Sequence, residues 1–128
     1  MLHKLSSLIA LVMLTCMVLV SAGSDAQAKN KFGAIAISPS SKAMGWSYNY
    51  NSKWKANQVA LQKCYQHASD CKIATWFRNA CGAVAVGSNG GWGAAWGRSI
   101  KQAKWKARKT CRKYDSHCKA RRWVCTDR

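Results

Sequence analysis

The hydrophobic pattern of this chain occurs twice. Apolar residues alternate with small ones over residues 33–37 and again over 82–86, a pattern typical of short strands. Each copy continues through a turn, a second strand, a helix and a third strand. The expected elements are 33–37, 44–50, 53–67 and 71–77, and then 82–86, 92–97, 100–114 and 118–124. This tandem β-β-α-β order predicts a small α+β domain.

The two predicted helices carry the same stripe of small residues. The stripes are Ala56, Ala60 and Cys64 in the first helix, and Ala103, Ala107 and Cys111 in the second. Residues four apart share one helical face, so the stripe lets each helix approach its sheet closely. Ser52 and Ser99 precede the helices and are the predicted N-caps.

The first 28 residues have the pattern of an export signal. Lys4 precedes a nearly continuous apolar run over residues 8–20, and Ala26-Gln27-Ala28 is a small-x-small cleavage site. The run is shorter than the roughly 20 apolar residues of a membrane span. We therefore predict a signal peptide over residues 1–28 and a secreted or periplasmic location.

The rest of the chain, residues 29–128, is predicted to form one domain. Its two repeats cover about 32–81 and 82–125, with no linker between them. Six of the seven cysteines lie in this part, an even number that indicates three disulfides in an exported protein.

Repeat symmetry reduces the possible cysteine pairings. The favoured pairs are Cys64–Cys71, Cys111–Cys118 and Cys81–Cys125. The first two would tie each helix end to the next strand, and the third would join the two halves. A zinc site is disfavoured because the chain has no Cys-x-x-Cys and an oxidising compartment favours disulfides. We predict neither a metal nor a cofactor.

The centre of the chain resembles a known family. The segment Trp76-Phe77-Arg78-Asn79-Ala80-Cys81-Gly82-Ala83 and the six-cysteine spacing over residues 32–125 resemble the bacterial secreted domain of unknown function numbered four-one-eight-nine. The resemblance implies export, tandem β-β-α-β units and disulfides. It implies no established reaction, so it identifies no catalytic residue. The chain is unusually rich in lysine and arginine for this family.

The charge of the chain is its strongest departure from an average domain. It has 21 Lys and Arg against 4 Asp and Glu, a net charge of +17. A net charge of about 2–8 keeps a small domain soluble, and further self-repulsion costs stability. The excess favours an anionic partner such as a membrane, an envelope glycopolymer or a nucleic acid. An exported protein with such a partner could be antimicrobial or effector-like.

The basic residues gather after position 97. Lys101, Lys104, Arg108 and Arg112 have the spacing of one helical face, separate from the small-residue stripe. The residues predicted to bind a polyanion are Lys101, Lys104, Lys106, Arg108, Arg112, Arg121 and Arg122.

All seven tryptophans lie after residue 28. Most are expected in the core, and Trp76 and Trp123, at matching positions in the third strands, are the default examples. Trp54 and Trp105 are each flanked by two lysines, so they are the predicted aromatic contacts to a membrane, base or sugar. In the competing interpretation these two rings lie over the sheet.

Two other functions stay open. An inhibitor or immunity protein for an envelope-acting enzyme or toxin would use the loops at 38–42 or 87–91, and its charge would steer it to an acidic target. A secreted ribonuclease would use His67 and His117 as base and acid. The remaining acids form no obvious catalytic pair. We predict a non-enzyme, and the sequence specifies neither the partner nor the oligomeric state.

Overall fold

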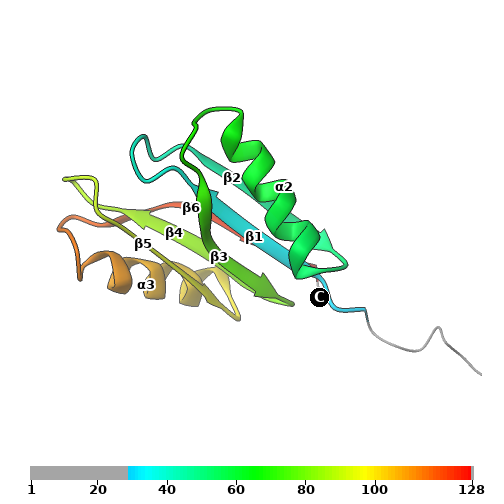
Figure 1. Ribbon diagram of the computed structural model, residues 1–128. Helices are drawn as coiled ribbons and strands as arrows, with labels where there is room; N and C mark the ends of the chain where they lie inside the picture. Colours follow the sequence, from blue (N-terminus) through cyan, green and yellow to red (C-terminus); the bar gives the residue numbers. More distant parts are fainter. Residues whose placement is uncertain (1–28, 128) are drawn as a thin grey trace, which may run out of the picture.

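The computed structural model describes residues 29–127 (Figure 1). Its elements are β1 (Phe32–Ile37), β2 (Met44–Tyr50), α2 (Lys53–Tyr65), β3 (Lys72–Arg78), β4 (Cys81–Val86), β5 (Trp92–Gly97), α3 (Ile100–Cys111) and β6 (Lys119–Cys125). This order confirms the predicted α+β fold of tandem β-β-α-β units. The predicted signal peptide over residues 1–28 lies outside the described residues. Within residues 29–127, no helix has the length and apolarity needed to cross a membrane.

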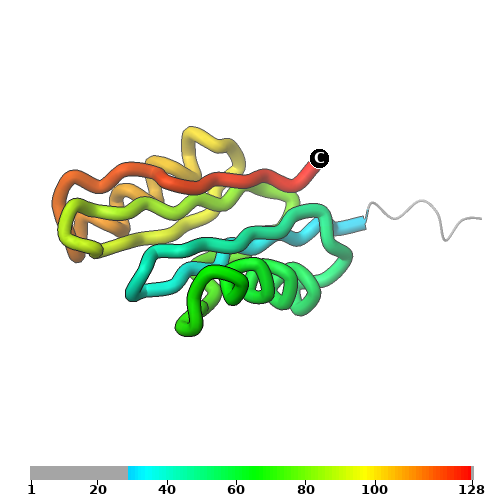
Figure 2. Tube along the Cα trace, turned by 90° about the horizontal axis from the view of Figure 1, so that it is seen from above, coloured from blue at the N-terminus to red at the C-terminus, as the bar shows by residue number. Residues whose placement is uncertain are grey.

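Each half folds into a three-stranded antiparallel sheet with its first strand in the centre. The strand orders are β2-β1-β3 and β5-β4-β6. The sheets pack against each other, and each carries its helix on the outer face, so the layers run helix, sheet, sheet, helix (Figure 2). β3 lies opposite β5, and β2 lies opposite β6.

The alternation along the central strands assigns a different kind of residue to each face. In β1, Ala34 and Ala36 pack beneath α2. Ile35, between them, faces the second sheet and packs with Phe77 and Val84. β4 follows the same rule, with alanines toward α3. Small residues therefore meet the helices, and larger ones fill the space between the sheets.

The helices lie very close to their sheets, as the small-residue stripes predict. Every residue of both stripes is fully buried. A Cβ atom on Gly45 would collide with backbone atoms of Ala60 and Cys64, and one on Gly93 with the corresponding backbone of α3. Glycine at these two positions is therefore a requirement of helix-on-sheet packing.

Both predicted N-caps are confirmed. The Ser52 hydroxyl accepts a hydrogen bond from the Lys55 amide, and the Ser99 hydroxyl accepts one from Gln102, each at 3.1 Å. The helices end two and three residues earlier than expected. Tight backbone turns follow them, because each helix ends near a cysteine bonded to another only seven residues further on.

The disulfides of the described residues are Cys64–Cys71, Cys111–Cys118 and Cys81–Cys125, the pairs expected from the repeat. One expectation about them is wrong. Cys81 begins β4 and pairs with Cys125 of the neighbouring strand β6, so this bond lies within the second sheet and does not join the halves. The disulfides indicate an oxidising, non-cytoplasmic environment.

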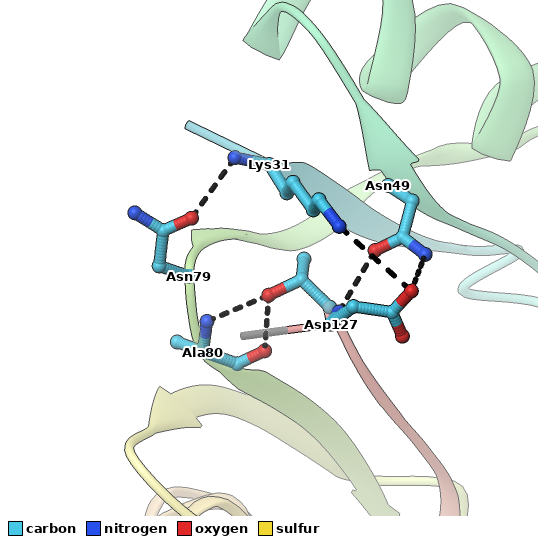
Figure 3. Close-up of polar contacts among 6 residues, drawn as sticks. Lys31, Asn49, Asn79, Ala80 and Asp127 are labelled. Carbon is cyan, nitrogen blue, oxygen red and sulfur yellow. Dashed lines mark hydrogen bonds and ion pairs between the residues drawn. The ribbon is translucent and has the colours of Figure 1, made fainter. Parts of the chain in front are cut away.

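Beyond the core between the sheets, a polar cluster joins the halves at the C-terminal end (Figure 3). The Asp127 amide donates to Asn49 Oδ1, and Asn49 Nδ2 donates to Asp127 Oδ2, both at 2.8 Å. Lys31 forms an ion pair with the same carboxylate at 3.9 Å. The end of β2 is thereby tied to the residues that follow β6.

Candidate functional site

The tryptophans lie closer to the surface than the sequence predicts. Trp76 and Trp123 are 40% and 42% exposed, so the expectation that they belong to the core is wrong. Both lie on edge strands, where the helix packed over the centre of the sheet does not cover them. Lysines cover them instead: Lys53 Nζ is 4.3 Å from the centre of the Trp76 ring, and Lys104 Nζ is 3.9 Å from that of Trp123.

This arrangement recurs across the described residues. The cation–ring pairs are Lys53–Trp76, Lys72–Trp92, Lys104–Trp123, Lys106–Trp96, Lys109–Trp105 and Arg122–Trp46. A cation over an indole face gains roughly 0.5–1 kcal/mol at exposed sites. Basic residues and tryptophans are therefore paired in both halves of the molecule.

One exposed group of cations surrounds Trp105 on α3. Trp105 is 51% exposed, and together with Lys101 and Arg108 it lines a shallow hollow of about 330 Å³. Lys109 Nζ lies 5.0 Å from the centre of its ring. We call Lys101, Trp105, Arg108 and Lys109 the Trp105 surface. It offers three cations around an indole ring that solvent can reach.

The first copy of the repeat lacks these charges. The two helices can be aligned by placing Ala56 on Ala103. In that alignment, α2 has neutral residues, Asn57, Val59, Leu61 and Gln62, where α3 has Lys104, Lys106, Arg108 and Lys109. By the same measure, Trp54 corresponds to Lys101 and not to Trp105. The two Lys-Trp-Lys triplets are therefore not equivalent, although both tryptophans are exposed as the binding hypothesis requires.

The carboxylates of the described residues are occupied elsewhere. Hydrogen bonds from Ser38 and Ser40 lower the pKa of Asp70. The amides of Ser116, Gly91 and Asn89 likewise lower the pKa of Asp115.

The hydrogen bonds to Asp70 and Asp115 tie the loop after each helix to the turn between the first two strands of the same half. Within residues 29–127, the ion pair present is Lys31–Asp127. In this part of the chain, no carboxylate neutralises α3 or β6.

The other residues predicted to bind a polyanion differ in availability. Arg112 and Arg121 are exposed, whereas Lys104 and Lys106 are half-buried beside their tryptophans. Arg122 does not belong to the open surface. Its place in β6 directs it toward the other sheet, where its guanidinium carbon lies 3.8 Å from the centre of the Trp46 ring and its Nε is buried.

The two histidines of the ribonuclease hypothesis are exposed loop residues. His67 follows α2 and His117 follows α3, and these helices form the two opposite outer layers. His117 Nδ1 lies 3.2 Å from Ser116 Oγ. The two histidines therefore belong to different halves of the molecule, each in the loop after its helix.

These features define a disulfide-bonded, two-copy α+β domain with a cationic, tryptophan-bearing second half. The model of the family described as "Domain of unknown function (DUF4189)" matches residues 32–125, and the chain belongs to that family. It is also similar to the "NMR structure of Rv1813c from Mycobacterium tuberculosis", at 29% identity over 74% of each chain and a TM-score of 0.56. No curated protein matches the chain.

Proposed function

We propose that this is an exported binding protein that engages an anionic surface or polymer through the Trp105 surface, and that the exposed Arg112 and Arg121 contribute charge. The observation that carries the proposal is the difference between the copies. Both helices cover the same kind of sheet, yet only the second has cations where the first has neutral residues. The fold therefore does not require these charges.

Within residues 29–127, these charges also form no ion pair. The carboxylates of residues 29–127 hold turns and the C-terminal cluster, so the field of α3 is directed at solvent. An unneutralised basic surface attracts anions over several ångströms and gains affinity by releasing their counterions. The exposed ring of Trp105 would add stacking or interfacial contact. The function proposed is binding, without catalysis.

A pair of charge-matched variants tests the proposal. The first replaces Lys101, Arg108 and Arg112 by Gln, and the control replaces the exposed Lys29, Lys55 and Lys63 by Gln. Both lose three charges. Binding of the oxidised protein to heparin, to single-stranded RNA and to phosphatidylglycerol vesicles would be measured across rising salt.

The first variant, called the α3 variant, is expected to lose affinity for whichever of these partners wild type binds. The slope of log K against log salt should become shallower by about 2–3. The control should bind within about twofold of wild type, apart from a general charge effect seen at low salt. Equal losses in both variants would mean that net charge alone drives binding. That result would refute a site on α3.

A second function is favoured by the rigidity of two turns. Asp70 holds the turn at 38–42, and Asp115 holds the turn at 87–91. Pre-organised loops on a disulfide-bonded domain suit an inhibitor or immunity protein with an acidic protein target. Retention of one protein from envelope extracts at high salt, lost when residues 87–91 are replaced, would support this function over the first.

A further inference from the structure

The two long edges of the sandwich, which the duplication should make alike, are built differently. At one edge β2 faces β6, and at the other β3 faces β5. Trp46 and Arg122 fill the first edge by stacking on each other. Trp46 follows Gly45, and the residue that follows the matching Gly93 is Ala94. Arg122 lies four residues after Cys118, and the residue four after the matching Cys71 is Thr75. Both counterparts are small.

The second edge is open as a result. A cavity of about 540 Å³ lies there, with Lys72 and Ala74 of β3 on one side and Trp92 and Ala94 of β5 on another. Thr110, in the last turn of α3, and Tyr114, in the turn after it, also line the cavity. Its volume is within the range of small-molecule sites, about 300–1,000 Å³.

The groups in this cavity suit a ring that bears hydroxyls and a negative charge. Trp92 supplies an aromatic face, with Lys72 Nζ 5.5 Å from its centre. Because β5 is an edge strand, backbone groups on its outer side have no strand partner. Hydroxyls of a ligand could bond to these groups and to Thr110.

The same combination recurs further along the two strands. Trp76, Phe77, Arg78 and Trp96 line a second hollow of about 290 Å³. Trp96 follows Trp92 by four residues, about 13 Å along a strand. An aromatic face beside a cation is thus offered twice along one edge, as a short chain of repeating rings would require.

We propose that this edge of the sandwich, the β3–β5 groove, binds an acidic oligosaccharide. One sugar would stack on Trp92 with its anionic group at Lys72, and the chain would continue toward Trp96 and Arg78. A nucleic acid strand fits less well, because Lys72 is the only cation among the residues that line the larger cavity. The inference rests on the proposed function only for its anionic class of partner, since it concerns a different surface.

Titration of the oxidised, ¹⁵N-labelled protein by NMR tests the proposal. The probes are trigalacturonate, a heparin tetrasaccharide, neutral cellotetraose and an oligothymidylate of four nucleotides. At least one acidic sugar should shift the Gly91 and Gly93 amides and the Trp92 indole resonance. Lys72→Gln should weaken that sugar at least fivefold. Ala94→Trp places a tryptophan where the other edge has Trp46, and it should abolish binding.

Three outcomes would refute the proposal for the groove. They are no shift of groove resonances with either acidic sugar, binding of cellotetraose as strong as that of the acidic sugar, or stronger binding of the oligothymidylate. If Ala94→Trp fails to fold, Lys72→Gln still decides the matter because Lys72 is exposed. The Gln variant at Lys101, Arg108 and Arg112 should retain the groove shifts. Loss of polymer binding in the α3 variant and loss of sugar binding in Lys72→Gln are therefore separate results, and each tests its own surface.

Discussion

At the scale of single residues, the few acidic side chains act as structural ties. Asp115 receives three backbone amides from its own loop and from the β4–β5 turn. Its side chain also fills the space that Cβ atoms on Gly87 and Gly91 would need. A carboxylate in this place therefore organises two loops at once, which explains why it is not available to neutralise α3.

This role predicts a pH dependence. Because hydrogen bonds lower the pKa of Asp115 below its usual 3.8, its stabilising effect is complete above that pH and disappears as the pH falls through the lowered value. Asp115→Asn should lower the melting temperature clearly at neutral pH. The gap to wild type should narrow as the pH falls through that lowered value, because protonation removes the charge of Asp115. A gap that stays constant in thermal melts across this range would contradict the assignment.

At the scale of elements, the two helices have the same architecture and different surfaces. Each begins at a serine N-cap, presents a stripe of small residues and ends at a disulfide. The stripe is needed for packing, so it is present in both copies. The opposite face is free to differ, and α3 carries cations at four places where α2 has neutral residues.

The caps give a test at this scale. Ser99→Ala removes the acceptor for the Gln102 amide at the start of α3 and should lower the free energy of unfolding by about 1 kcal/mol. Ser52→Ala should have a similar effect on α2, because its bond to Lys55 has the same length. Urea denaturation measures both. A negligible cost at either position would show that water replaces the cap there.

At the scale of the molecule, packing between the sheets and the cluster around Asp127 hold the halves together. The Cys81–Cys125 disulfide acts inside the second half, where it links β4 to β6. The matching residues of the first half, Phe32 and Arg78, also face each other across neighbouring strands but have no covalent bond. The second half, which carries the cationic helix, is thus the more heavily cross-linked.

Disulfide removal tests this arrangement. The sequence separation is 44 for Cys81–Cys125 and 7 for Cys64–Cys71. The chain-entropy relation then gives about 4 kcal/mol for the first and about 2.5 kcal/mol for the second. Replacing each pair by alanine should therefore destabilise the protein more at 81 and 125, as measured by denaturant titration. The reverse order would indicate that core packing around Cys64, not loop entropy, dominates.

The amino-acid sequence by itself determined what depends on local spacing. The duplication, the order and most bounds of the elements, both N-caps, the small-residue stripes and the cysteine pairs all follow from periods of two and four residues and from symmetry between the copies. These features involve residues that are close in the chain or repeated at a fixed interval. For the same reason, the cationic face of α3 could be recognised before any fold was known.

Only the tertiary structure decided what depends on which segments lie side by side. Trp76 and Trp123 are exposed because their strands are at sheet edges, and Arg122 is withdrawn because its face of β6 meets Trp46. The place of Cys81 within the second sheet and the β3–β5 groove have the same origin. Alternation along a strand divides residues between two faces, and the packing of the two sheets determines what each face meets.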